Sequence, residues 1–150
     1  MTEERSPTVV EVRSGGDGLR TEIAMRGHAL VADEPVASGG MDAGPTPYEL
    51  LSAALGACIA MTLRLYAERK GWPLEGVVVR LRHSKIWEKD CEDCDRAPVG
   101  VDRIERAVEL EGPLDEEQRQ RILAIADRCP VKQTLARGVR IVAAHVPAQA

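Results

Sequence analysis

The chain has 150 residues, of which 20 are basic and 24 are acidic, and its formal net charge is -4. This mild acidity, with no run of Lys and Arg, argues against nucleic acid or an anionic membrane surface as a partner. The length suits one domain with a buried core, so we expect a single domain over residues 1–150. Because Phe is absent, that core must consist mainly of Leu, Ile, Val, Ala and Met.

The polar N-terminus predicts a loose tail over residues 1–7 and lacks the apolar centre of a signal peptide. The longest apolar stretch, Leu50–Leu63, is broken by Ser52 and Thr62 and is shorter than the roughly 20 residues that span a bilayer. We therefore expect a soluble, cytoplasmic protein without a membrane partner. Cysteines in that compartment are usually reduced, so a disulfide here would be transient and catalytic.

Three short strands are predicted in the first third of the chain. Residues 8–13 have strand character, residues 19–25 alternate between apolar and polar side chains, and the Gly-rich segment between them is typical of a hairpin turn. A third strand is expected over His28–Ala32. A loop rich in Gly and Pro follows it, over residues 33–45.

A long helix is predicted from Pro47 to about Lys70. Thr46 can cap its N-terminus, Glu49 suits the positive end of its dipole, and Gly71 would end it. Apolar residues at helical spacing cover a wide face, so this helix should be buried on most sides. They are Leu50, Leu51, Ala54, Leu55, Cys58, Met61, Thr62, Leu65 and Tyr66.

Two further strands are predicted in the second half, over residues 77–83 and residues 103–110, with a polar, irregular segment between them. Asp115 is the expected cap of a second helix, because Gln118 follows three residues later as in a capping box. That helix should end before Cys129.

A short helix over residues 130–136 and a closing strand over residues 139–146 complete the expected elements. The order of strands, long helix, strands and helix indicates the α+β class.

Two cysteines lie in settings that packing alone explains poorly. Cys58 follows a run of small residues that lets other backbone come close, and Cys129 directly precedes Pro130 at a helix start. A helix N-terminus favours the thiolate, which is the reactive form of cysteine, whereas a thiol in mid-helix needs a partner from elsewhere. Composition alone leaves open whether the two are buried small hydrophobes or a redox pair.

The segments Gly44–Leu51, Gly56-Ala57-Cys58 and Ala126–Val131 together resemble the OsmC/Ohr superfamily of osmotically induced and organic hydroperoxide resistance proteins. The resemblance extends over about residues 20–146. It implies an OsmC-like fold, in which a long central helix packs on a curved antiparallel sheet. It also implies an intertwined homodimer with an active site at each of two subunit interfaces.

The resemblance further implies the chemistry. Cys58 would attack an organic hydroperoxide, Cys129 would resolve the resulting sulfenic acid as a disulfide, and an external dithiol would reduce that disulfide. No haem, flavin or metal is required. The substrate would enter an apolar pocket near Cys58, lined by residues such as Leu55, Met61 and Thr62.

One departure from the resembled pattern concerns activation of Cys58. Hydroperoxide reductases of this superfamily place a glutamate directly after the helix-start proline, where it orients an arginine against the reactive thiol. Here Tyr48 occupies that position and Glu49 comes next, a rotation of about 100° on a helix. Arg20 is the best match for the arginine and Arg26 the second, although an ordinary exposed strand charge is the simpler interpretation of each.

Cys91 and Cys94 form a single CxxC in the polar segment. A structural zinc site would need two further ligands, and His83 is the nearest histidine. Such a pair is more often an exposed hairpin tip with incidental thiols. The sequence therefore leaves two alternatives to the peroxidase: a small-ligand-binding protein that keeps the fold, and a zinc-dependent interaction module.

Overall fold

The computed structural model describes residues 9–16, 18–87 and 100–144, and the chain divides into two compact units, Met1–Ser52 and Ala53–Ala150. The long helix α1 (Pro47–Lys70) begins in the first unit and continues in the second. That the chain forms a single domain stays a prediction.

The first unit contains a three-stranded antiparallel sheet in the order β1-β2-β3, formed by β1 (Val10–Ser14), β2 (Thr21–Met25) and β3 (His28–Ala32). Met25 pairs with His28, so the β2–β3 hairpin has a two-residue turn, Arg26-Gly27. Both turn residues have positive φ, 47° and 81°, as the twist of a tight hairpin requires. The predicted hairpin of the first two strands is confirmed, because β1 pairs antiparallel with β2, and the predicted third strand is confirmed with the same bounds.

The loop after β3 includes a short 3-10 helix, Val36–Ser38, and is organised by a buried carboxylate. Asp33 is 2% exposed and accepts hydrogen bonds from the backbone amides of Glu34, Met41 and Ala43. These amide hydrogen bonds, led by those of Ala43 and Glu34, hold the pKa of Asp33 below its usual value. The loop that leads into α1 is therefore fixed by one ionised side chain.

The start of α1 is a reciprocal capping box. The Thr46 amide donates to Glu49 Oε2 at 2.7 Å, and the Glu49 amide donates to Thr46 Oγ1 at 3.2 Å. At the other end Gly71 adopts a φ of 65° and its amide bonds to the Glu68 carbonyl. The predicted helix is confirmed at both ends.

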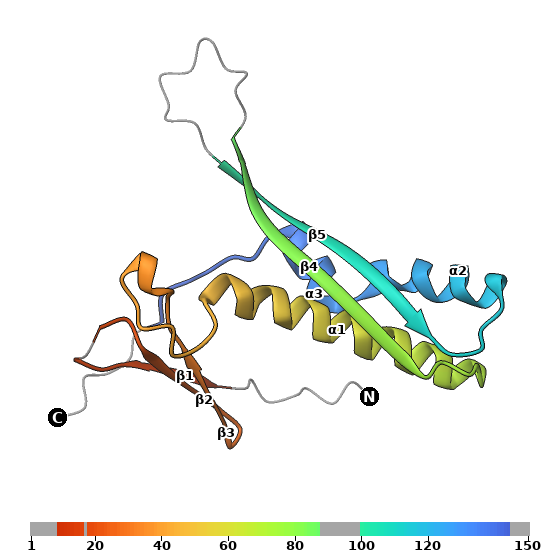
Figure 1. The fold of residues 1–150 in the computed structure, drawn as a ribbon, viewed down its shortest axis with the longest axis horizontal. Helices are drawn as coiled ribbons and strands as arrows, with labels where there is room; N and C mark the ends of the chain where they lie inside the picture. Colours follow the sequence, from red (N-terminus) through yellow and green to blue (C-terminus); the bar gives the residue numbers. More distant parts are fainter. Residues whose placement is uncertain (1–8, 17, 88–99, 145–150) are drawn as a thin grey trace, which may run out of the picture. The chain divides into compact units, whose positions relative to one another are not determined.

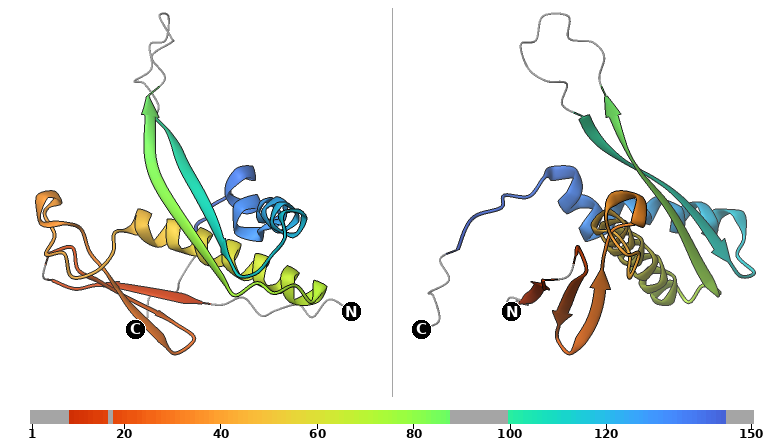
Figure 2. Two further views of the ribbon diagram at one scale, coloured as in Figure 1. Left: turned by 45° about the vertical axis from the view of Figure 1, so that its right-hand side comes forward. Right: turned by 60° about the vertical axis from the view of Figure 1, so that its left-hand side comes forward.

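The second unit joins the rest of α1 to a long antiparallel ribbon and two further helices. The ribbon consists of β4 (Gly76–Trp87) and β5 (Gly100–Glu111), and it packs against α1 (Figure 1). Helices α2 (Glu116–Ile125) and α3 (Pro130–Arg137) follow, separated by a 3-10 turn, Ala126–Arg128. The views in Figure 2 show both helices alongside α1 and the ribbon.

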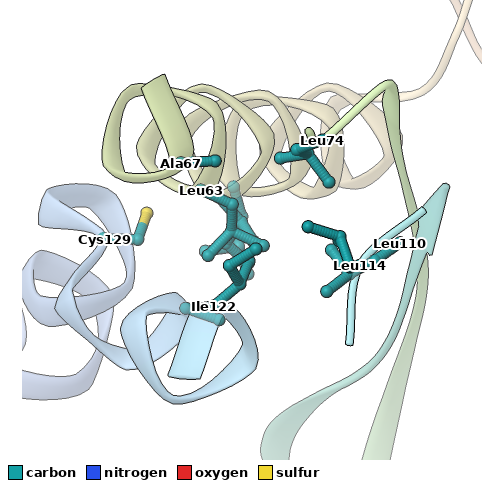
Figure 3. Close-up of a cluster of buried hydrophobic side chains, with 10 residues drawn as sticks. Leu63, Ala67, Leu74, Leu110, Leu114, Ile122 and Cys129 are labelled. Carbon is teal, nitrogen blue, oxygen red and sulfur yellow. The ribbon is translucent and has the colours of Figure 1, made fainter. Parts of the chain in front are cut away.

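The core of this unit is a single cluster of buried side chains contributed by α1, β5, α2 and the connections between them (Figure 3). The cluster consists of Leu55, Ile59, Leu63, Ala67, Leu74, Leu110, Leu114, Ile122, Ala126 and Cys129.

The start of α2 is as the sequence predicts. Asp115 caps the helix through the predicted capping box with Gln118.

The predicted closing strand is wrong over its described part. Residues 139–144 form no regular structure, and residues 145–146 lie outside the described residues. Within the described chain this segment pairs with no strand, and Ile141 is 92% exposed. Strand propensity alone cannot form a strand, because the backbone groups need a partner.

By length and composition alone, α1 could cross a membrane, since it has 24 residues and a mean hydropathy of 1.6 in its most apolar window. The core helix of a soluble protein meets the same criteria. Leu55, Ile59, Leu63 and Ala67 of α1 are buried in the protein's own core, as in a core helix, whereas Leu51, Met61 and Leu65 are exposed. The expectation that this helix is buried on most sides is therefore wrong for the single chain, which buries one face of it.

Candidate redox site

Cys58 lies in the middle of α1, where the ribbon approaches the helix closely. Its side chain is half-buried and packs against the core, and its carbonyl accepts a hydrogen bond from Thr62 Oγ1 at 2.7 Å. Two residues earlier, a β-carbon on Gly56 would lie 2.7 Å from Leu81 Cδ1 of β4. The small residues that precede Cys58 therefore admit the ribbon beside it.

Cys129 is the N-cap residue directly before α3, and its thiol is fully buried, with 0% exposure. Its amide bonds to the Ala126 carbonyl at 3.4 Å, and its carbonyl accepts from Gln133 at 3.1 Å. Pro130 occupies the first helical position, where the lack of an amide hydrogen costs nothing. In Figure 3 the sulfur points toward α1.

The fold brings the two thiols into contact, although they lie far apart in the sequence. Burial raises the pKa of the Cys129 thiol, and the hydrogen bond with Cys58 raises it further, whereas the backbone amides of Lys132 and Val131 lower it. The backbone amides at the helix start thus lower the pKa of Cys129, as the sequence suggests, but burial raises that pKa by more. Cys129 is held as a neutral thiol beside Cys58.

The raised pKa of Cys129 predicts that stability falls at alkaline pH. Because the folded-state pKa lies above the ordinary value of 9.0, this thiol contributes stability that is fully present below pH 9.0 and is lost as the pH rises through the folded-state pKa. Cys129→Ala should remove this contribution. We expect the melting temperature of the variant, measured with reductant, to fall less steeply above about pH 9 than that of the parent. A parallel fall in both proteins would contradict the prediction.

A charged group on β5 reaches the turn that precedes Cys129. Arg106 Nη1 donates to the Ala126 carbonyl at 3.3 Å, and Nη2 donates to Asp127 Oδ1 at 2.7 Å. Lys132 Nζ lies 3.4 Å from the same Asp127 oxygen. The charge of Arg106 and its hydrogen bond, followed by Lys132, hold the pKa of Asp127 below its usual value.

Sequence reasoning missed Arg106, although a signal for it exists. In β5 the half-buried and buried positions alternate through Ile104, Arg106, Val108 and Leu110. An arginine in an inward-facing apolar series needs partners, because an unpaired buried charge is costly.

The predicted activating residues lie in the first unit. Arg20 Nη1 pairs with Glu22 Oε1 at 2.9 Å, and its side chain is 42% exposed. Arg26 occupies the β2–β3 turn. Glu49 is used in the capping box at the start of α1, and Tyr48 is 47% exposed. The roles assigned to Arg20 and Glu49 stay predictions.

A family model described as OsmC-like protein matches residues 39–143, a range that includes both Cys58 and Cys129. This range covers more than half of the chain. The chain belongs to the OsmC-like protein family.

Solved structures show the same fold. An OsmC-like protein from Mycoplasma pneumoniae superposes with a TM-score of 0.67 at 18% identity, covering 88% of this chain and 89% of that one. An organic hydroperoxide resistance protein, OsmC, from Legionella pneumophila gives a TM-score of 0.62 at 18% identity, covering 86% and 88%. An organic hydroperoxide resistance protein from Elizabethkingia anophelis gives 0.65 at 17% identity and covers 91% of each chain. No curated protein sequence matches.

The expected α+β, OsmC-like fold is thus confirmed. Identities in this range establish the fold alone.

No group of three or more metal-ligating side chains occurs among the residues that the structure of this OsmC-like protein describes. His83 Nε2 lies 2.8 Å from Asp102 Oδ1 across the ribbon. Cys91 and Cys94 lie outside the described residues. The proposed zinc module therefore gains no support from the described part of the chain.

Proposed function

We propose that this OsmC-like protein is a thiol-dependent peroxidase that reduces organic hydroperoxides through Cys58 and Cys129. The observation that carries the proposal is the contact between two free thiols of unequal access, one half-buried and one fully buried. This difference in solvent access suits a pair in which the Cys58 sulfur reacts with the substrate and the Cys129 sulfur reacts only with Cys58.

The Cys58 thiolate would attack the terminal oxygen of the hydroperoxide. The O–O bond breaks, a sulfenic acid forms on Cys58, and the alkoxide takes a proton from solvent and leaves as an alcohol. The Cys129 thiol then attacks the sulfenic sulfur, the S–S bond forms, and the hydroxyl leaves as water with the thiol proton. An external dithiol reduces the disulfide and is itself oxidised.

The direct test is oxidation of the reduced protein with about one equivalent of cumene hydroperoxide, followed by peptide mapping. We expect one Cys58–Cys129 disulfide and one equivalent of cumyl alcohol. Oxidation no faster than that of free cysteine would exclude the peroxidase.

The activating role of Arg20 is a further part of the proposal. If a positive charge from Arg20 favours the Cys58 thiolate, Arg20→Ala should slow alkylation of Cys58 by iodoacetamide at neutral pH about tenfold or more. Arg20→Lys should restore part of the rate, because lysine keeps the charge without the planar fork. Arg26→Ala is the control and should change little. A slowing by Arg26→Ala alone would assign the activating charge to Arg26.

Glu49→Gln tests the carboxylate without removing the helix cap. Glutamine can replace glutamate at this position of a capping box, so α1 should still begin at Pro47. Any loss of peroxide turnover in this variant would then report the missing charge.

An assembly of two copies is also proposed, as the family resemblance implies. Apolar side chains remain exposed on α1 and in the segment that forms no strand, among them Met61 at 65%, Leu65 at 53% and Ile141 at 92%. Exposed apolar side chains of this kind suit a protein interface. We expect light scattering to give the mass of a dimer, about twice 16.3 kDa, and a monomer at micromolar concentration would contradict the proposal.

A second candidate function is binding of a small apolar ligand. The first unit contains a hollow of about 450 Å³ lined mainly by apolar side chains, including Leu19, Ile23 and Leu50. A protein that binds cumyl alcohol without turning over cumene hydroperoxide would favour this candidate.

A further inference from the structure

The turn that carries Cys129 is fixed at three points. Arg106 binds the Ala126 carbonyl and the Asp127 carboxylate, both within the 3-10 turn before Cys129. Lys132, in the first turn of α3, pairs with the same carboxylate from the other side of Cys129. The Asp127 carboxylate therefore joins Arg106 of β5 to Lys132, and these contacts lie on both sides of the buried thiol.

These contacts act on position more than on charge at the sulfur. The groups that shift the pKa of Cys129 are its own burial, Cys58 and the amides of Lys132 and Val131. Arg106 instead donates its two hydrogen bonds to the Ala126 carbonyl and the Asp127 carboxylate, which precede the thiol in the chain. Charge-assisted hydrogen bonds of this kind are stronger and more directional than neutral ones.

We propose that Arg106 and Asp127 form a positioning clamp that holds the Cys129 sulfur against Cys58 and so sets the rate of disulfide formation. The proposal rests on the proposed function, in which Cys129 resolves a modified Cys58. A thiol attacks a neighbouring sulfur faster when the geometry is fixed, because the effective concentration of a well-placed group far exceeds that of a mobile one.

The clamp can be tested without peroxide by using the chromogenic disulfide DTNB. Its disulfide is cleaved by Cys58, which forms a mixed disulfide and releases one coloured thiolate. Cys129 then displaces the second thiolate, forms the Cys58–Cys129 disulfide, and gives its proton to solvent. Because Cys129 is fully buried and Cys58 is half-buried, the first release reports Cys58 and the second reports the resolving step.

The experiment uses the full chain carrying Cys91→Ser and Cys94→Ser, which removes the other two of the four cysteines. In this background Arg106→Gln should slow the second release about tenfold and leave the first within about twofold. Arg106→Lys should recover part of the rate, because lysine can pair with Asp127 but lacks the fork that also reaches Ala126.

Arg80→Gln is the matched control. Arg80 lies on the same ribbon and forms a salt bridge of the same kind, with Glu109 at 2.8 Å, but that pair is exposed, and Glu109 is its ion-pair partner rather than a residue of the Cys129 turn. It should leave both releases unchanged. If Arg106→Gln folds poorly, Asp127→Asn tests the same clamp, since it replaces one carboxylate oxygen in a side chain that is 60% exposed and should slow the second release alone.

The ratio of the two releases distinguishes a clamp from a general structural role, because a loss of stability without displacement of Cys129 would leave the ratio unchanged. An unchanged ratio in Arg106→Gln and Asp127→Asn, or an equal change in Arg80→Gln, would overturn the proposal. Failure of the parent to react with cumene hydroperoxide would instead overturn the proposed function, while the DTNB ratio would still report the clamp.

Discussion

Cys58→Ser should abolish hydroperoxide reduction, whereas Cys129→Ser should still reduce the first equivalent and then stop. Serine is close to cysteine in size, so each variant changes the volume of the core little, and circular dichroism should show that both variants fold. With Cys58 gone, the remaining thiol of the pair is fully buried and its pKa is raised, so it is neither accessible nor ionised at neutral pH. With Cys129 gone, the sulfenic acid on Cys58 has no resolving partner and should accumulate.

The measurement is dimedone trapping followed by peptide mass spectrometry, combined with steady-state turnover with a dithiol reductant. We expect the dimedone adduct on Cys58 in Cys129→Ser and no adduct in Cys58→Ser. An adduct on Cys129 with Cys58 unmodified would reverse the two roles.

The sequence predicts most of the local structure because the relevant signals are local. Pro47, Thr46 and Glu49 define the start of α1, and Gly71 defines its end, through bonds made within a few residues. The capping box at Asp115 is predictable for the same reason. Each of these features depends on side chains that meet the backbone next to them in the chain.

The C-terminal segment shows where local signals fail. Val139, Ile141 and Val142 have strand propensity, yet residues 139–144 form no strand in the described chain. Propensity indicates that a segment fits a pleated surface, but it does not identify the strand with which the segment pairs. The sequence pattern would be the same if this segment paired with a strand of another copy of the chain.

The sequence singles out Cys58 and Cys129 as candidates, but it does not predict the electrostatics of Cys129. The flanking sequence indicates a helix start at Cys129 and hence a lowered pKa, whereas the fold buries the thiol and raises that pKa. Burial depends on α1 and α2, which lie elsewhere in the sequence. The contact with Cys58 likewise comes from tertiary packing, and only the family resemblance anticipated it.

Leu63→Ala should destabilise the protein by about 2–5 kcal/mol, the usual cost of removing a leucine from a closed core. Leu63 is 0% exposed and belongs to the same buried cluster as Ile122 and Cys129. The truncated side chain would leave a cavity that α1 and α2 cannot close without moving. We expect the midpoint of urea unfolding to fall while the dependence on urea concentration stays unchanged.

Leu65→Ala is the control on the same helix, because the chemical change is identical and only burial differs. Leu65 is 53% exposed, so in an isolated chain its replacement should alter stability by no more than about 0.5 kcal/mol. A small effect of Leu63→Ala would contradict the core described here. A cost for Leu65→Ala close to that of Leu63→Ala, and dependent on protein concentration, would mean that the exposed face of α1 is covered in solution. A second copy of the chain would produce that dependence, since dissociation then accompanies unfolding.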